Sequence, residues 1–210
     1  MLNSANRRIK NDQQKVSFGL VANHSVTNWL YAIILCCMLI AFFTNDAFFN
    51  WAFDRHHNTL SWWLRPLMVL PFALAAWYRS WSGIWLSLVA MFSSMFWFPA
   101  PEVPDPKVME FLAMEKTLLQ SGWTMTNMLG AASVMAYGIF LGAALWKRSL
   151  WLGLGVVVLG GVLKMLWSIT FSPEAGDSII PIAIVATGFT VLYLGYIFHR
   201  HRKRTKKNAS

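Results

Sequence analysis

Six apolar runs separated by short polar segments constrain this chain more than any other feature of its sequence. A helix rises about 1.5 Å per residue, so a run of about 20 apolar residues crosses the hydrocarbon core of a bilayer. The chain is 56% hydrophobic and only 13% charged, which leaves few charges to solvate a soluble surface. The sequence therefore predicts an all-α membrane protein, a six-transmembrane-helix bundle over residues 27–198, with helices expected at 27–44, 60–78, 83–98, 123–146, 150–171 and 179–198.

The basic residues predict on which side of the membrane each terminus lies. If the N-terminal arm, residues 1–26, is cytoplasmic, thirteen Lys and Arg residues lie in cytoplasmic segments and three on the opposite side, namely Arg55, Lys107 and Lys116. Lys and Arg accumulate in the cytoplasmic loops of membrane proteins. The count predicts that the arm and the polybasic tail, residues 199–210, are both cytoplasmic. The compact loops favour a bacterial inner membrane as the cell membrane that holds this multi-pass chain.

The second apolar run is the weakest of the six, because it contains Arg65, Pro66 and Pro71. An arginine at the centre of a span costs roughly 2.5–3.5 kcal/mol on insertion scales. Without this span, however, either the arm or the tail would lie outside, against the distribution of Lys and Arg. We therefore retain it as a membrane helix.

The tail carries six cations between Arg200 and Lys207. Anionic lipid headgroups attract each such residue by about 1 kcal/mol near a membrane surface. The tail is therefore expected to contact membrane lipids. Nucleic acid is not expected as a partner, because no aromatic platform or folded basic face accompanies the run. A protein partner within the membrane is left open.

Arg65 and Lys164 are the two cations inside apolar runs. Counted from the outer ends of their helices, they lie about 8 Å and about 11 Å deep, so both belong to the outer half of the membrane. Charges at such depth commonly face a bundle interior and mark functional sites, whereas long side chains can also reach the headgroups. For Arg65 both interpretations stay open. For Lys164 an interior position is favoured, because Gly160 and Ser168 share its helical face and small residues permit close packing.

Residues 106–120, between the third and fourth runs, have the pattern of a short interfacial amphipathic helix. Asp105 is a suitable N-cap and Pro106 a suitable first residue. At about 100° per residue the apolar side chains form one broad arc, and Glu115 lies in its middle. We expect Glu115 to face the bundle and to pair with Lys164 or Arg65. The alternative is a shallow helix whose Glu115 reaches water.

A polar cluster of Asp54, His56 and His57 precedes the second helix. Imidazole and carboxylate groups offer a general base or a proton relay, so these three are the candidate catalytic residues. A metal site is not expected, because adjacent histidines diverge by about 100° on a helix and neither HxxH nor HxxxH spacing occurs. The alternative is structural, with Asn58 or Thr59 as the cap of the second helix.

Several signatures of enzymes are missing from the sequence. No histidine lies deep in a span, which argues against a bis-histidine haem, and neither a GxSxG motif nor a phosphate-binding glycine loop occurs. The adjacent Cys36 and Cys37 point in different directions on a helix and predict no disulfide. Both a cofactor and an enzymatic activity are therefore left undetermined.

Three kinds of function fit these observations. The favoured one is binding or handling of an anionic, lipid-like amphiphile at the outer leaflet, with Arg65, Lys164, Glu115 and Ser168 as candidate substrate-binding residues. A second is a small subunit or assembly factor of a membrane complex. A third is an outer-leaflet membrane enzyme that uses the histidine cluster. A carrier is disfavoured, because the inner halves of the helices contain few polar residues.

Overall fold

The computed structural model describes residues 25–171 and 180–207 of the chain. Every regular element in this part of the chain is a helix. Four helices are long and apolar enough to cross a membrane, namely Ser25–Thr44, Thr59–Trp77, Met125–Trp146 and Leu150–Thr170, and Trp81–Phe96 is a shorter apolar helix. The predicted helical membrane fold is confirmed at this level, with four helices that meet the criteria for a span against the six that the sequence predicts.

After the first helix, Ser25–Thr44, the chain continues through short and long helices in turn. Their bounds are α2 Asp46–His56, α3 Thr59–Leu67, α4 Val69–Trp77, α5 Trp81–Ser93, the 3₁₀ turn η1 Ser94–Phe96, α6 Pro106–Gln120, α7 Met125–Trp146, α8 Leu150–Phe171 and α10 Ile180–Lys207. α4 packs against α5 and α7, while α8 packs against α7 and α10.

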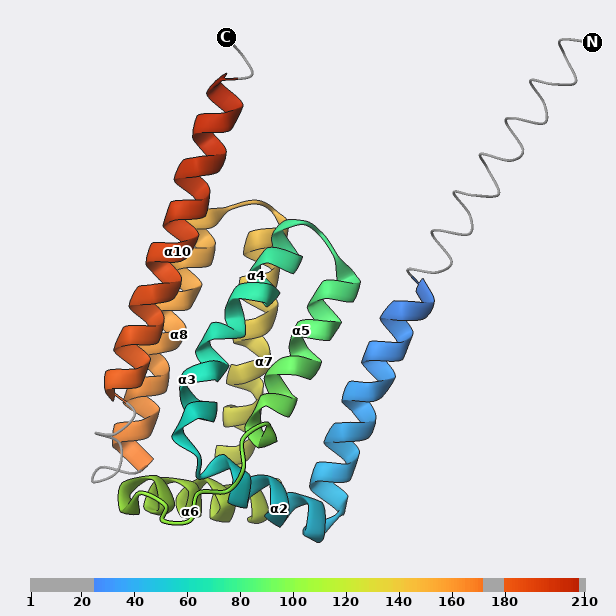
Figure 1. The fold of residues 1–210 in the computed structure, drawn as a ribbon, viewed down its shortest axis with the longest axis vertical. Helices are drawn as coiled ribbons and strands as arrows, with labels where there is room; N and C mark the ends of the chain where they lie inside the picture. The colour runs from blue at the N-terminus through green and yellow to red at the C-terminus, as the bar shows by residue number, and fades with distance from the viewer. Residues whose placement is uncertain (1–24, 172–179, 208–210) are drawn as a thin grey trace, which may run out of the picture.

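The bundle has two distinct ends (Figure 1). α2 and α6 lie across one of them, which we call the α6 end, and run roughly perpendicular to the long helices. The α4–α5 and α7–α8 connections lie at the opposite end, which we call the connection end. The first helix begins at the connection end, and α10 ends there.

The second predicted span is present as Thr59–Trp77 and is interrupted at Met68, which divides it into α3 and α4. α3 contains Pro66 and ends at Leu67, and α4 begins at Val69 after the intervening Met68. Pro71 explains the break, because a proline has no N–H to donate to the carbonyl four residues earlier and its ring crowds that carbonyl. The third predicted span also differs, since α5 passes into the 3₁₀ turn η1 before its expected end.

Two clusters of buried side chains form the core. The first lies at the α6 end and is largely aromatic, with Phe42, Phe49, Ala52, Phe53, Trp62, Met95, Val108, Phe111 and Leu112 as members. The second lies between the long helices and consists of Phe72, Ala73, Ala75, Ala76, Ile84, Leu141, Leu145, Leu150, Val157 and Leu194. The first cluster holds α2 and α6 against the end of the bundle, and so positions the side chains that these two helices carry.

Large apolar side chains also cover much of the outer surface of the bundle. Ile33, Leu129, Ile139 and Leu163 are all more than half exposed. Only 11% of the apolar window of the first helix, and 17% of those of α7 and α8, is buried within the chain. Such extensive exposed apolar surface suits lipid as the solvent and would be a liability in water.

α8 packs through the face that carries its small residues. A Cβ on Gly160 would lie 2.5 Å from the ring of Tyr137 on α7, and one on Gly161 would lie 2.6 Å from the hydroxyl of Thr187 on α10. Val157 and Ser168 on the same helix are buried. The predicted inward packing of this face is therefore confirmed, because only glycine permits these approaches.

The predicted helix over residues 106–120 is present as α6 with the same bounds, and the Asp105 side chain accepts a hydrogen bond from the Lys107 N–H at 2.8 Å. α2 was not expected, and it extends through the predicted histidine cluster as far as His56. Asn45 caps α2 by accepting a hydrogen bond from the Phe48 N–H at 3.0 Å.

Candidate functional site

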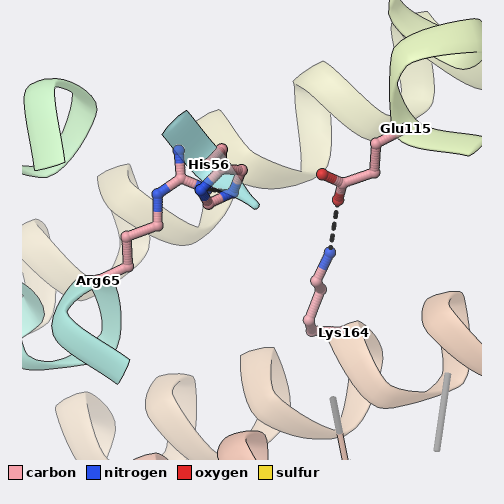
Figure 2. Close-up of polar contacts among 4 residues, drawn as sticks. All are labelled: His56, Arg65, Glu115 and Lys164. Atoms are coloured by element: carbon pink, nitrogen blue, oxygen red, sulfur yellow. Dashed lines mark hydrogen bonds and ion pairs between the residues drawn. The ribbon is translucent and has the colours of Figure 1, made fainter. Parts of the chain in front are cut away.

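Four polar side chains from four different helices approach one another near the α6 end. His56 comes from α2, Arg65 from α3, Glu115 from α6 and Lys164 from α8. Figure 2 shows that they form two pairs, with Arg65 directed toward His56 and Glu115 directed toward Lys164. We call these four residues the charged cluster.

Glu115 and Lys164 form an ion pair, with 3.4 Å between Oε1 and Nζ. The buried side chains of Val108, Phe111 and Leu112 turn one face of α6 toward the bundle, and Glu115 follows Phe111 and Leu112 by four and three positions on that face. The Lys164 ammonium also lies 5.4 Å from the centre of the Phe111 ring, a cation–π distance. The predicted inward Glu115 is thus confirmed, with Lys164 rather than Arg65 as its ion-pair partner.

This ion pair is only partly shielded from the outside. The Lys164 side chain is 49% exposed and that of Glu115 is 29% exposed. The interior position that the sequence favoured for Lys164 is therefore wrong: its side chain lies at the surface of α8, half exposed, although Ser168 one turn further along is buried. An accessible ammonium can exchange one anionic partner for another.

Arg65 makes a hydrogen bond to the buried imidazole of His56, with 3.1 Å between NH1 and Nε2. Because a guanidinium only donates, Nε2 must be the acceptor and carries no proton. The proton therefore lies on Nδ1, which donates to the Ser61 Oγ at 2.8 Å, and the Ser61 hydroxyl donates to the Asn58 carbonyl at 2.8 Å. The contacts assign a single neutral tautomer to His56.

His56 stays neutral in the folded protein because it is buried. Desolvation is the largest cause that lowers the pKa of His56 from 6.5 to about 2, and the positive charge of Arg65 is the next. His57 and Lys164 lower the pKa further. The indole of Trp62 donates to the His56 carbonyl at 3.0 Å, which fixes the end of α2 against α3.

The charges of the cluster do not balance. With His56 neutral, two cations face a single carboxylate, so the cluster has one positive charge in excess. The Glu115 carboxylate lies within electrostatic range of Arg65 as well as in contact with Lys164. An excess positive charge at a partly apolar site is expensive unless an anion accompanies it.

Ser168 lies one helical turn beyond Lys164 on α8 and is fully buried, with 0% of its surface exposed. Its Oγ has no hydrogen-bond partner among the residues that the structure describes. An unsatisfied buried hydroxyl is uncommon and costs about 1–3 kcal/mol. A ligand beside Lys164 that brought an acceptor atom to this hydroxyl would remove that cost.

The remaining members of the predicted histidine cluster lie outside the charged cluster. Asp54 is exposed at the surface of α2. The His57 Nδ1 contacts the backbone carbonyl of Asp54 at 3.1 Å and not its carboxylate. Within the described residues, no hydrogen bond or ion pair joins Asp54 or His57 to Arg65, Glu115 or Lys164.

The neighbouring polar residues have structural roles. Asn58 caps α3 by accepting a hydrogen bond from the Leu60 N–H at 3.1 Å, as predicted, and its amide donates to the Pro99 carbonyl at 3.0 Å. Arg55 donates to the Phe96 carbonyl at 2.8 Å and stacks over Trp51. These contacts hold α2 and the start of α3 against the end of η1 and the segment that follows it.

The sequence did not predict the link between His56, Ser61 and Arg65. The signal was present, because a serine in the first turn of α3 and an arginine four residues later share one helical face. The sequence did not show the sharp turn after α2, which brings His56 onto this face of α3. The side chains of the tail between Arg200 and Lys207 lie outside the described residues. The contact of the tail with membrane lipids therefore stays a prediction.

Among the described residues, no three His, Cys, Asp or Glu side chains lie together as a metal site would require, and Cys36 and Cys37 are both free and exposed. Comparison of the chain with models of protein families, with curated proteins and with solved structures found no match in any of the three. The function therefore has to be inferred from the geometry of the charged cluster and its position in the bundle.

Proposed function

We propose that this protein is a six-span protein of the cell membrane, with both termini cytoplasmic, that binds an anionic amphiphile in the outer leaflet. The observation that carries the proposal is the excess positive charge of the charged cluster beside the buried Ser168 hydroxyl, which has no hydrogen-bond partner among the described residues. Binding, rather than catalysis, is what the arrangement supports, because both ring nitrogens of His56 are already engaged.

The distribution of charge between the two ends of the bundle supports this orientation. The connection end carries Arg79, Lys147 and Arg148, whereas all acids in the described part of the chain belong to the region of α2 and α6. The first helix begins, and α10 ends, at the cation-rich connection end (Figure 1). By the positive-inside rule this end is cytoplasmic and the charged cluster is in the outer half.

Six spans are supported by the two helices that fall outside the strict criteria. The helix Trp81–Phe96 is apolar but short, and α10 is long, with 28 residues, but ends in the basic tail. Both run alongside the other long helices between the two ends of the bundle (Figure 1). Exposed aromatic rings near both ends, where membrane proteins concentrate Trp and Tyr, fit the same boundaries: Trp29, Tyr78, Trp81 and Trp151 toward one end, and Trp51, Trp97 and Trp123 toward the other.

The surroundings of Lys164 support an amphiphile over a small soluble anion. Its neighbours Leu163 and Leu166 are more than half exposed on α8, on the surface that an acyl chain would contact. The headgroup anion would then lie between Arg65 and Lys164, in competition with Glu115, and would accept a hydrogen bond from Ser168. Arginine suits this role because its planar guanidinium still has N–H donors beyond the one that His56 occupies.

Titration calorimetry of the full chain in a neutral detergent tests the proposal, with dodecyl phosphate as the anionic probe and dodecylphosphocholine as its zwitterionic counterpart. We expect dodecyl phosphate to bind at least about tenfold more tightly, and Arg65→Gln and Lys164→Gln each to remove at least about tenfold of that affinity. Inorganic phosphate should bind weakly, since it has no chain to contact the exposed leucines.

Lys116→Gln is the matched control, because it removes one positive charge from α6 without touching the charged cluster. This variant should bind dodecyl phosphate as the original protein does. Lys164→Gln keeps the test valid even where Arg65→Gln folds poorly, because Lys164 is half exposed. Equal affinity for both detergents, or unchanged affinity in both cluster variants, would refute the proposal.

A further inference from the structure

The connection end brings three cations together from two separate connections. Arg79 lies between α4 and α5, and Lys147 and Arg148 lie between α7 and α8. The Arg79 Nε donates to the backbone carbonyl of Trp146 at 3.1 Å, which places the guanidinium beside the residue that precedes Lys147. The rings of Trp81 and Trp146, 4.9 Å apart, hold the two connections together.

The backbone of both arginines adopts a conformation that favours glycine. Arg79 has a φ of 57° and Arg148 a φ of 56°, the only positive values at non-glycine residues in the described part of the chain. A left-handed conformation costs a residue with a Cβ roughly 1–2 kcal/mol. At both helix ends glycine would be the less strained choice, so the arginine side chains are retained at a cost in stability.

Within the part of the chain that the structure describes, no acid lies near these cations. All three side chains are exposed, and the acids of the described residues lie at the α6 end. The α7 carbonyl that binds Arg79 neutralises only part of one charge, as a helix C-terminus carries about half an elementary charge. Three like charges in one patch repel one another and raise the local concentration of anions.

We propose that the cations Arg79, Lys147 and Arg148 form a binding site for the phosphate headgroup of an anionic phospholipid. The flanking aromatic residues fix the depth of the site, because Tyr78, Trp81 and Trp151 are 71%, 55% and 79% exposed around it. Such rings mark the level of the headgroups, so the anion that reaches this patch belongs to a lipid. The site is at the opposite end of the bundle from the charged cluster and is independent of it.

The test measures how many phosphatidylglycerol molecules the full chain retains in a neutral detergent, by native mass spectrometry. Arg79→Asn with Arg148→Asn removes two charges, and asparagine tolerates the left-handed conformation. We expect this double variant to lose at least about tenfold in affinity for phosphatidylglycerol relative to phosphatidylcholine. Lys147→Gln should lose a smaller part of the affinity for phosphatidylglycerol. Because Lys147 has an ordinary backbone conformation, this substitution is the second variant if the double variant folds poorly.

The matched control is Arg202→Gln with Arg204→Gln, which removes two charges from the tail at the same end of the chain. It should lose much less affinity for phosphatidylglycerol than Arg79→Asn with Arg148→Asn, because the contact between Arg79 and Trp146 brings the cations of the connection end together. Equal losses in both double variants would show a bulk charge effect and overturn the proposal. Full displacement of the lipid by inorganic phosphate would also overturn it, since the site would then take a free anion.

Discussion

Lys164 and Arg65 are both cations within apolar helices, and each is stabilised in its own way. Lys164 has a carboxylate from α6 and an aromatic ring beneath its ammonium. Arg65 instead has a neutral imidazole as its acceptor, which leaves its charge uncompensated at the point of contact. An anion that enters the charged cluster therefore finds Arg65 as the group with the greater unsatisfied charge.

The ion pair between Lys164 and Glu115 can be tested by exchanging its charges. Lys164→Glu places two carboxylates together and should lower the temperature of unfolding in neutral detergent. The further change Glu115→Lys should restore it. Because both side chains are partly exposed, we expect the pair to contribute only about 0.5–1 kcal/mol. A doubly exchanged variant no more stable than Lys164→Glu alone would contradict the pairing.

His56 makes the stability of the protein depend on pH. In the folded protein the His56 ring has a pKa of about 2, whereas in the unfolded chain its pKa is the ordinary value of 6.5. The unfolded state therefore binds more protons as the pH falls below 6.5, and stability decreases by up to about 1.4 kcal/mol for each unit. Thermal unfolding measured between about pH 7 and about pH 5 should show this decrease. In His56→Gln the unfolding temperature should fall less between these pH values. The same pH dependence in that variant would contradict the assignment of a buried neutral His56.

Ser168→Ala separates a role in binding from a role in packing. Removing an unsatisfied buried hydroxyl should leave the free protein as stable as before or slightly more stable. In the dodecyl phosphate titration the same variant should bind several-fold more weakly, because the acceptor on the ligand loses its donor. A variant that is destabilised and binds as tightly as the original would assign Ser168 to packing alone.

Part of this cluster was predictable from single residues and part was not. The position of Glu115 within an apolar arc indicated an inward carboxylate. The small-residue face of α8 indicated an inward Lys164 as well, but that side chain is half exposed. The choice between Lys164 and Arg65 as partner depended on how α6 lies across the end of the bundle, which no helical period specifies. The burial of His56 depended on a turn between two short helices.

At the scale of elements, the contact between α7 and α8 is close at two glycines of α8, Gly153 and Gly160. Gly160→Ala would place a Cβ 2.5 Å from the Tyr137 ring and should destabilise the protein by about 1–3 kcal/mol. Gly155→Ala, on the same helix with nothing within 4 Å, is the matched control and should be neutral or slightly stabilising. Chemical or thermal unfolding in neutral detergent compares the two. Equal effects in both variants would contradict close packing at Gly160.

The elements that the sequence predicted best are those with a strong local signal. The bounds of α6 follow from a capping aspartate and a proline at its first position, and the long helices follow from continuous apolar runs. α2 was missed because it has only 11 residues and mixes aromatic with polar side chains. Pro66 and Pro71 indicated a break within the second span, but the presence of two prolines does not specify the residue at which the helix is interrupted.

At the scale of the whole molecule, two cationic regions lie at opposite ends of one bundle. The charged cluster combines cations with an acid, whereas the three cations of the connection end have no acid nearby in the described chain. We propose that the two regions act in different leaflets, the charged cluster on a single amphiphile and the three cations on a headgroup at the membrane surface. Both assignments depend on the orientation of the bundle.

Labelling of single cysteines in intact cells tests that orientation most directly. In a background with Cys36→Ala and Cys37→Ala, Lys107→Cys places a thiol on exposed α6 and Lys147→Cys places one at the connection end. A membrane-impermeant maleimide should label Lys107→Cys in intact cells and Lys147→Cys only after the membrane is permeabilised. The reverse pattern, or labelling of both in intact cells, would contradict an oriented bundle with its charged cluster in the outer leaflet.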